Sequence, residues 1–165
     1  MIKVTLKGDV IKEYEAGTTV AEIAKSIGMG LYKSACGGKI NGNYCDLRTE
    51  VNSDCELNIL TFNDDAGKRA FRHTASHVLA EAVKALYPDA KLTIGPSIDE
   101  GFYYDFDTEY RFSEEDFAKI EKEMRKIIKA KLPIERSEKS RDEALAWARE
   151  NKQKYKVEII KSHWP

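Results

Sequence analysis

The chain has no excess of charge of either sign. Its 27 lysines and arginines are matched by 28 aspartates and glutamates, which gives a formal net charge of -1. Proteins that bind nucleic acid nonspecifically carry a broad positive field, and this composition excludes one. Any contact with RNA must therefore be made locally, by a few side chains.

Long apolar runs are also missing. No segment approaches the roughly 20 apolar residues that are needed to cross a bilayer. The N-terminus also lacks the basic start and apolar stretch of a secretory signal. These two absences predict a cytoplasmic protein without a membrane span.

Cysteine is scarce, and the three residues of this type, Cys36, Cys45 and Cys55, fall in one segment. Their spacing is not that of a zinc knuckle or a redox pair. We therefore expect reduced thiols, as in a reducing compartment.

The length of 165 residues allows one ordinary domain or two small ones, and the sequence pattern favours two. Near the N-terminus, Ile2, Val4 and Leu6 alternate with polar residues, as in a strand with one solvent-facing side. Gly8-Asp9 predicts a turn, and residues 10–14 predict the second strand of a hairpin.

A short helix should follow this hairpin. Thr19 and Glu22 have the spacing of a capping box, and Gly28 should end the helix. Its apolar stripe is expected to consist of Val20, Ile23, Ala24 and Ile27. Further along, Asn41-Gly42 predicts a second hairpin turn, and residues 57–60 predict a last strand.

This order of elements has a known parallel. Together with the segment Glu15-Ala16-Gly17-Thr18-Thr19-Val20-Ala21-Glu22-Ile23-Ala24, it resembles the TGS domain, a ubiquitin-like β-grasp module. The family occurs at the N-terminus of threonyl-tRNA synthetases and in certain GTPases. The resemblance implies a β-grasp fold for residues 1–62, and such a module can also act as a noncatalytic RNA- or protein-binding domain.

The second half opens with a polar junction at residues 63–68 and a long helical pattern that Pro88 closes. Its apolar stripe is predicted to contain Phe71, Thr74, Ala75, Val78, Leu79, Ala82, Val83 and Leu86. His73 and His77 lie one turn apart beside this stripe, so both imidazoles can address one point. Two of the three histidines form this pair, and Ala70, Ala80 and Lys84 continue its row, so we interpret this face as the wall of a pocket.

The segment after this helix predicts two strands joined by a turn, over residues 92–107. Phe102, Tyr104 and Phe106 should share one face of the second strand, with Tyr103, Asp105 and Asp107 on the other. Gly95-Pro96 interrupts the first strand at a point where a ligand could approach the backbone closely.

Two further helices and two strands complete the predicted elements. Ser113 and Asp116 should begin a long helix that Pro133 stops, with Phe117, Ile120, Met124 and Ile127 as its core stripe. A short strand is expected near Ile134. Ser140 and Glu143 should begin a helix that contains Leu145 and Ala148, and residues 155–160 predict a final strand.

Three motifs of the second half occur in a recognisable order: His73-x-x-x-His77, Ile94-Gly95-Pro96 and Gly101-Phe102-Tyr103-Tyr104-Asp105-Phe106. They resemble the editing domain of bacterial-type threonyl-tRNA synthetases. The resemblance implies that His73 and His77 line the site that hydrolyses misacylated tRNA, and that Lys156 is a lysine of the same site. Gly95 and Tyr104 match positions near the bound aminoacyl adenosine.

The two resemblances together imply an α+β chain, with a β-grasp domain over residues 1–62 and an editing domain with a long His-bearing helix against a sheet over residues 63–165. In this family the whole enzyme removes serine from mischarged tRNA(Thr), so the acceptor end of tRNA(Thr) is the implied partner. The whole enzyme is a homodimer that uses ATP, magnesium and a zinc ion in a ligase domain. Neither that domain nor a cofactor is expected here, and the chain should be a monomeric, truncated piece with an incomplete pocket.

The implied chemistry suits these residue types. Serine lacks one methyl group of threonine, a difference worth ~1 to 3 kcal/mol in a binding pocket, so binding alone discriminates weakly and a hydrolytic second site is needed. A histidine with a pKa of ~6.5 can take a proton from water near neutral pH. Lys156 could orient the ester or stabilise developing negative charge.

The histidine pair has two other interpretations. It could bind zinc in a metal-dependent hydrolase, but Thr74 stands where a zinc protease needs its glutamate, and no cysteine follows His77. It could also be a pair of partly buried structural histidines. We expect a site without metal.

Overall fold

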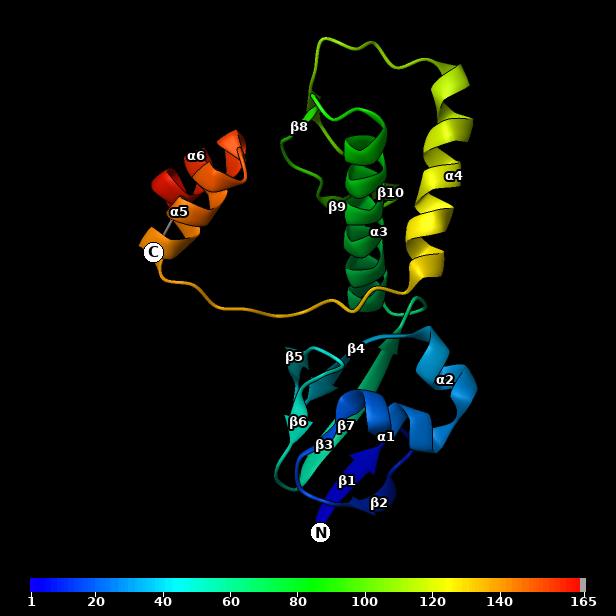
Figure 1. Ribbon diagram of the computed structural model, residues 1–165. Coiled ribbons are helices and arrows are strands. Elements are labelled where there is room, and N and C mark those ends of the chain that lie inside the picture. The colour runs from blue at the N-terminus through cyan, green and yellow to red at the C-terminus, as the bar shows by residue number, and fades with distance from the viewer. Residues whose placement is uncertain (164–165) are drawn as a thin grey trace. The chain divides into compact units, whose positions relative to one another are not determined.

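A computed structural model describes residues 1–163 of the chain, in two units, Met1–Arg72 and His73–Pro165. The division falls within the long helix α3 (Asp65–Leu86). Both units mix helices and strands (Figure 1), so the predicted α+β class is confirmed. Within residues 1–163, none of the helices has the length and apolarity that a bilayer crossing requires.

The first unit is built on a sheet of five strands in the order β2-β1-β7-β4-β5. These strands are β1 (Ile2–Leu6), β2 (Val10–Tyr14), β4 (Ala35–Ile40), β5 (Asn43–Cys45) and β7 (Cys55–Thr61). The central pair, β1 and β7, is parallel, and the other pairs are antiparallel. Two short strands, β3 (Thr18–Thr19) and β6 (Glu50–Val51), pair beside this sheet.

Both predicted hairpin turns of the first unit are confirmed. Gly8 and Asp9 have positive φ angles of 82° and 58°, and Asn41 and Gly42 have φ angles of 47° and 86°. Two consecutive positive φ angles are typical of the tight turns whose twist matches a β-hairpin. Local backbone preference therefore sets the register of both hairpins.

Helices α1 (Val20–Ile27) and α2 (Met29–Ser34) follow the first hairpin, and α1 lies on one face of the sheet (Figure 1). Thr19 and Glu22 form the predicted capping box. Val20 and Ile23 are buried against the strands, whereas Ile27 is 40% exposed. Ile27, at the end of the helix, is covered less than the rest of the predicted stripe but lines an apolar cleft together with Leu6, Leu57 and Ile59 of the sheet.

The second unit combines short strand pairs with helices. Its strands are β8 (Lys91–Leu92), β9 (Ser97–Ile98), β10 (Gly101–Phe102) and β11 (Phe106–Asp107), and its helices are α3, α4 (Glu114–Ala130), α5 (Arg141–Glu150) and α6 (Lys154–His163). Strand β8 pairs with β11 and β9 with β10, both antiparallel. The predicted capping boxes at Ser113 and Ser140 are present.

The two strands predicted over residues 92–107 are broken into four short ones. Residues 93–96 adopt no regular structure, because the Pro96 nitrogen has no hydrogen to donate and Gly95 lies in close contact with a tyrosine ring. The predicted alternation survives in part, since Phe102, Tyr104 and Phe106 are partly buried.

Two strand predictions near the C-terminus were wrong. Residues 132–140 form neither helix nor strand, and residues 155–160 lie in helix α6. The turn before α6 explains the second error. Lys152 has a φ of 53°, and the Gln153 amide donates back to the Ala148 carbonyl over 2.8 Å, a helix C-cap that normally relies on glycine. This turn brings α6 back against α5.

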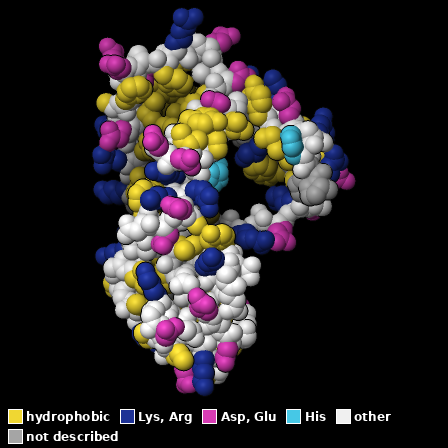
Figure 2. Space-filling model, turned by 180° about the vertical axis from the view of Figure 1, so that it is seen from behind, with side chains coloured by type: hydrophobic (Ala, Val, Ile, Leu, Met, Phe, Trp, Pro, Cys, Tyr) yellow, Lys and Arg dark blue, Asp and Glu magenta, His cyan; other side chains and the backbone are white. Residues whose placement is uncertain are grey.

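Helices α3 and α4 share an apolar core. It contains Ala82, Val83, Ala90 and Ile120 with Leu79, Tyr87, Phe106, Met124 and Ile127 packed around them. An apolar cleft of about 290 Å³ lies between the two helices, and apolar side chains gather over this region (Figure 2). Phe117 is 62% exposed at the rim of this cleft, so its predicted place in the core was wrong, whereas Leu145 and Ala148 are buried in α5.

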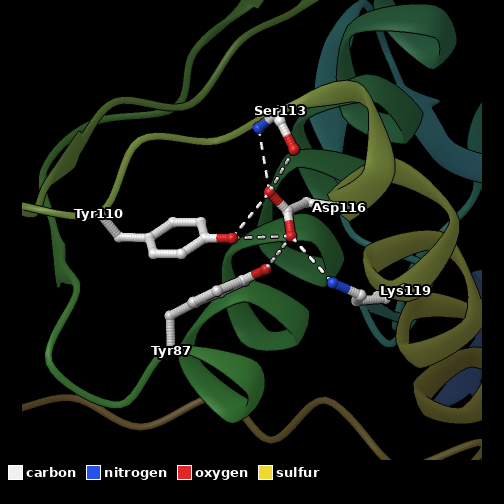
Figure 3. A network of polar contacts seen from close by, with 5 residues as sticks. All are labelled: Tyr87, Tyr110, Ser113, Asp116 and Lys119. Atoms are coloured by element: carbon white, nitrogen blue, oxygen red, sulfur yellow. Dashed lines mark hydrogen bonds and ion pairs between the residues drawn. The ribbon is translucent and has the colours of Figure 1, made fainter.

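Asp116 joins the ends of α3 and α4 through a network of donors around its buried carboxylate (Figure 3). Its carboxylate accepts hydrogen bonds from the Ser113 backbone, from the hydroxyls of Tyr87 and Tyr110 at 2.8 and 2.9 Å, and from Lys119 at 3.3 Å. These donors hold the pKa of Asp116 well below its usual range, the Ser113 amide most strongly. The sequence predicted only the capping part of this role.

The core of the first unit provides a stability test. Ile23 is completely buried, so the Ile23→Ala substitution should reduce the free energy of unfolding of this unit by about 3 kcal/mol through lost burial and a cavity. Ile11 on β2 is 61% exposed, so Ile11→Ala should change it by less than about 0.5 kcal/mol. Urea denaturation followed by NMR signals of the first unit measures both, and equal effects would contradict this core.

The Asp116 network provides a test of pH dependence. A carboxyl whose pKa is lowered by folding adds stability above its unfolded pKa of ~3.9, and this stability is lost as the pH falls through the lower, folded pKa. Asp116→Asn should therefore melt earlier than the wild type at neutral pH and lose less stability on acidification.

Melting temperatures from neutral to about pH 2 provide the measurement. Asp89 is exposed, so Asp89→Asn serves as the control and should keep the wild-type dependence of melting temperature on pH. A profile for Asp116→Asn that runs parallel to that of the wild type would show that the carboxylate does not contribute in this way.

Candidate functional site

The two histidines of α3 lie in direct contact. Their Nε2 atoms are 3.2 Å apart and their ring centroids 4.7 Å apart, with the rings nearly perpendicular. The predicted common face is therefore confirmed. Both side chains are exposed at the surface of the described residues, so the wall that they form is open rather than enclosed.

The environment of His77 favours the neutral imidazole. Partial burial lowers its pKa, and the electrostatic influence of His73 and of the Lys156 ammonium group lowers it further. A neutral imidazole has a lone pair that can accept a proton at neutral pH. His77 is therefore the better candidate for a base.

Ser76 ties this part of α3 to the loop that precedes β9. Its hydroxyl lies 2.8 Å from the carbonyl oxygens of both His73 and Gly95, and its side chain is completely buried. Sequence reasoning missed this residue. The sequence feature that could have indicated it is its position directly before His77, on the side of the helix that carries the apolar stripe.

Gly95 and Tyr104 pack directly on one another. A Cβ atom at position 95 would lie 2.0 Å from the Tyr104 ring, so the ring occupies the space that any other residue would fill. Backbone hydrogen bonds between Asp105 and Ile94 and between Thr93 and Asp105 hold the two segments together. Tyr104 also stacks on Phe106 and lies 6.4 Å, between ring centroids, from His77.

Lys156 lies on helix α6 rather than on a strand. Its ammonium group lies 5.2 Å from the centroid of the Trp147 ring, and its charge acts on His77. The five predicted site residues thus come from three places in the second unit: His73 and His77 from α3, Gly95 and Tyr104 from the strand region, and Lys156 from α6.

Within residues 1–163, no group of three or more histidine, cysteine, aspartate or glutamate side chains is placed to hold a metal ion. Cys36, Cys45 and Cys55 are free thiols of the first unit, and burial raises the pKa of each. What the arrangement offers is acid-base and electrostatic chemistry from imidazole, ammonium and phenol groups.

The first unit can be assigned to a class by comparison. Residues 2–61 match the family model of the TGS domain, and the parallel central strands crossed by α1 are its ubiquitin-like β-grasp sheet. Residues 2–61 thus match the TGS domain. Over nearly its whole length the chain is homologous to the N-terminal region of threonine–tRNA ligases, which confirms the expected relation to that region.

Three relatives illustrate this homology. The chain is 56% identical to the threonine–tRNA ligase of Clostridium acetobutylicum over 98% of its length, 53% identical to that of Acetivibrio thermocellus over 98%, and 51% identical to that of Desulforamulus reducens over 97%. It covers 25% of each relative. The chain therefore spans about a quarter of the length of the curated relatives that it matches.

The contact between Gly95 and Tyr104 gives a prediction with a matched control. Gly95→Ala should displace the Tyr104 ring, reduce the free energy of unfolding of the second unit by about 1 to 3 kcal/mol and change the NMR shifts of the His77 ring. Gly101→Ala adds its methyl group to open space and should leave these shifts in place. An unchanged His77 ring in Gly95→Ala would contradict the packing.

Proposed function

We propose that the second unit is the proofreading part of a threonine–tRNA ligase, which hydrolyses tRNA(Thr) mischarged with serine. The contact of His73 with His77, beside Tyr104 and within range of the Lys156 charge, is the observation that carries this proposal. Homology to ligases over nearly the whole chain supports it. The joining of threonine to tRNA is proposed for the longer enzyme only.

The reaction is the hydrolysis of an ester between the seryl carboxyl group and the ribose of the terminal adenosine. Water attacks the ester carbonyl, and a base must take its proton as the new bond forms. His77 suits this role because its lowered pKa leaves the imidazole neutral, and His73 can share the proton across the 3.2 Å between their Nε2 atoms.

Two further groups suit the charge and shape of the substrate. Negative charge develops on the carbonyl oxygen in the transition state, and the ammonium group of Lys156 can stabilise it. The Tyr104 ring, stacked on Phe106 and packed on Gly95, lies beside the histidines, where its partly exposed side chain can contact an adenine or ribose ring. The product ribose hydroxyl takes back a proton when it leaves.

The partner implied by this chemistry is the acceptor end of tRNA. The balanced charge of the chain provides no broad field, so recognition should depend on contacts near the histidine pair. Discrimination against threonine requires that its extra methyl group disfavour the productive position at this second site.

The histidine pair can be tested directly by substitution. His73→Ala should slow the deacylation of seryl-tRNA(Thr) by roughly 10²- to 10⁴-fold, because the acid-base help of the pair is lost. His163→Ala removes the remaining histidine, on α6, and should leave the rate unchanged. The measurement follows the loss of radiolabelled serine from tRNA(Thr), with threonyl-tRNA(Thr) as the control substrate.

Two outcomes of this assay would count against the proposal. Hydrolysis of seryl and threonyl esters at the same rate would remove the proofreading role. Equal activity of His73→Ala and the wild type would favour a noncatalytic module that binds RNA or protein through the TGS domain.

A further inference from the structure

Helix α6 is attached to the strand region by the residue that directly precedes Lys156. The hydroxyl of Tyr155 donates a hydrogen bond of 2.8 Å to Oδ2 of Asp107 on β11, across 48 positions of sequence. Both side chains are only partly exposed at this contact. The bond joins the α5–α6 pair to a different part of the same unit.

Asp107 is itself held in place. It lies opposite Lys91 in the antiparallel pairing of β11 with β8, and the Lys91 ammonium group approaches the same carboxylate oxygen to 3.4 Å. The hydrogen bond from Tyr155 and that from Lys91 lower the pKa of Asp107, so the acceptor is a full carboxylate at neutral pH. A hydrogen bond to an ionised acceptor is stronger than a neutral one.

Strand β11 connects this anchor to the histidine pair. Phe106, the neighbour of Asp107, stacks on Tyr104 with 5.0 Å between ring centroids, and Tyr104 in turn contacts His77. Because successive residues of a strand point to opposite faces, Phe106 can face the core while Asp107 faces α6. A two-residue strand thus touches both the aromatic side of the candidate site and the helix that carries its lysine.

We propose that the Asp107–Tyr155 hydrogen bond is a positioning device, which orients helix α6 so that Lys156 faces the histidine pair. This inference rests on the proposed function, because it concerns the same site. Asp107 and Tyr155 are positioning residues in it, since neither touches the reacting groups.

The geometry of a helix explains why this bond determines the direction of the lysine. Successive residues of an α-helix are about 100° apart around its axis, so fixing Tyr155 on Asp107 also fixes the direction in which Lys156 leaves the helix. The contact of Lys156 with Trp147 lies within the α5–α6 pair and cannot set its direction relative to α3.

The test follows the titration of His77 by NMR in the full chain. The rings of His73 from its own helix and of Tyr104 from the strand region contact His77, and the charge of Lys156 from α6 acts on it. Lys156 disfavours the imidazolium ion, so loss of its charge in Lys156→Gln should raise the pKa of His77. Tyr155→Phe, which removes only the anchoring hydroxyl, should raise it as well, and so should Asp107→Asn.

The double variant identifies the mechanism. If Tyr155 acts through Lys156, then Tyr155→Phe should not raise the pKa of His77 further in the Lys156→Gln background. Tyr103→Phe removes an exposed hydroxyl from the strand region and should leave this pKa unchanged. Spectra of the His73→Gln and His163→Gln variants assign the His77 signals.

Two results would overturn the inference. One is a His77 pKa that rises in Lys156→Gln but stays at its wild-type value in Tyr155→Phe. The other is a His77 pKa that Lys156→Gln leaves unmoved. The titration needs no substrate, so it tests the positioning role separately from the proposed hydrolysis. The proposed hydrolysis is tested by the deacylation assay with the wild type and His73→Ala. Where the wild type hydrolyses seryl-tRNA(Thr), Tyr155→Phe should be roughly tenfold slower.

Discussion

The packing of the Tyr104 ring on the bare backbone of Gly95 is the constraint on which the candidate site depends. A side chain at position 95 would collide with that ring at 2.0 Å, so only glycine allows the two segments to approach so closely. The Gly95 carbonyl then accepts from the buried Ser76 hydroxyl, one residue before His77. The missing side chain at Gly95 and the hydrogen bond from Ser76 together place the Tyr104 ring beside the histidine pair.

Two aspartates that accept hydrogen bonds from tyrosine hydroxyls, Asp116 and Asp107, organise the rest of the second unit, and they have different consequences. Tyr87 and Tyr110 meet the buried Asp116 carboxylate in a network that joins the ends of α3 and α4, where the apolar core lies. Tyr155 meets Asp107 near the surface and joins α6 to the strand region. The first contact stabilises the fold of the unit. The second is proposed to fix the direction of the Lys156 side chain. Both keep a carboxylate ionised, because hydroxyl donors stabilise its charged form.

Local sequence signals predicted the elements whose structure is decided locally. The Asn41-Gly42 turn and the capping box at Thr19 are of this kind, because adjacent residues determine both. The segment 155–160 was predicted as a strand because its alternation is typical of one. It forms part of α6 instead, after a turn at Lys152 that carries no glycine to signal it. The pairing of the histidines followed from their spacing. The roles of Ser76 and Asp107 depend on contacts with distant segments, which a single sequence does not encode visibly.

The proposed function requires the histidine pair, Tyr104 and Lys156 to form one binding site for the end of a seryl-tRNA. NMR mapping of the chain with a stable adenosine derivative that carries serine through an amide at its 3′ position tests this requirement. We expect shift changes at His73, His77, Tyr104 and Lys156, and weaker ones with the threonyl derivative. Changes confined to the first unit, or none at all, would contradict it.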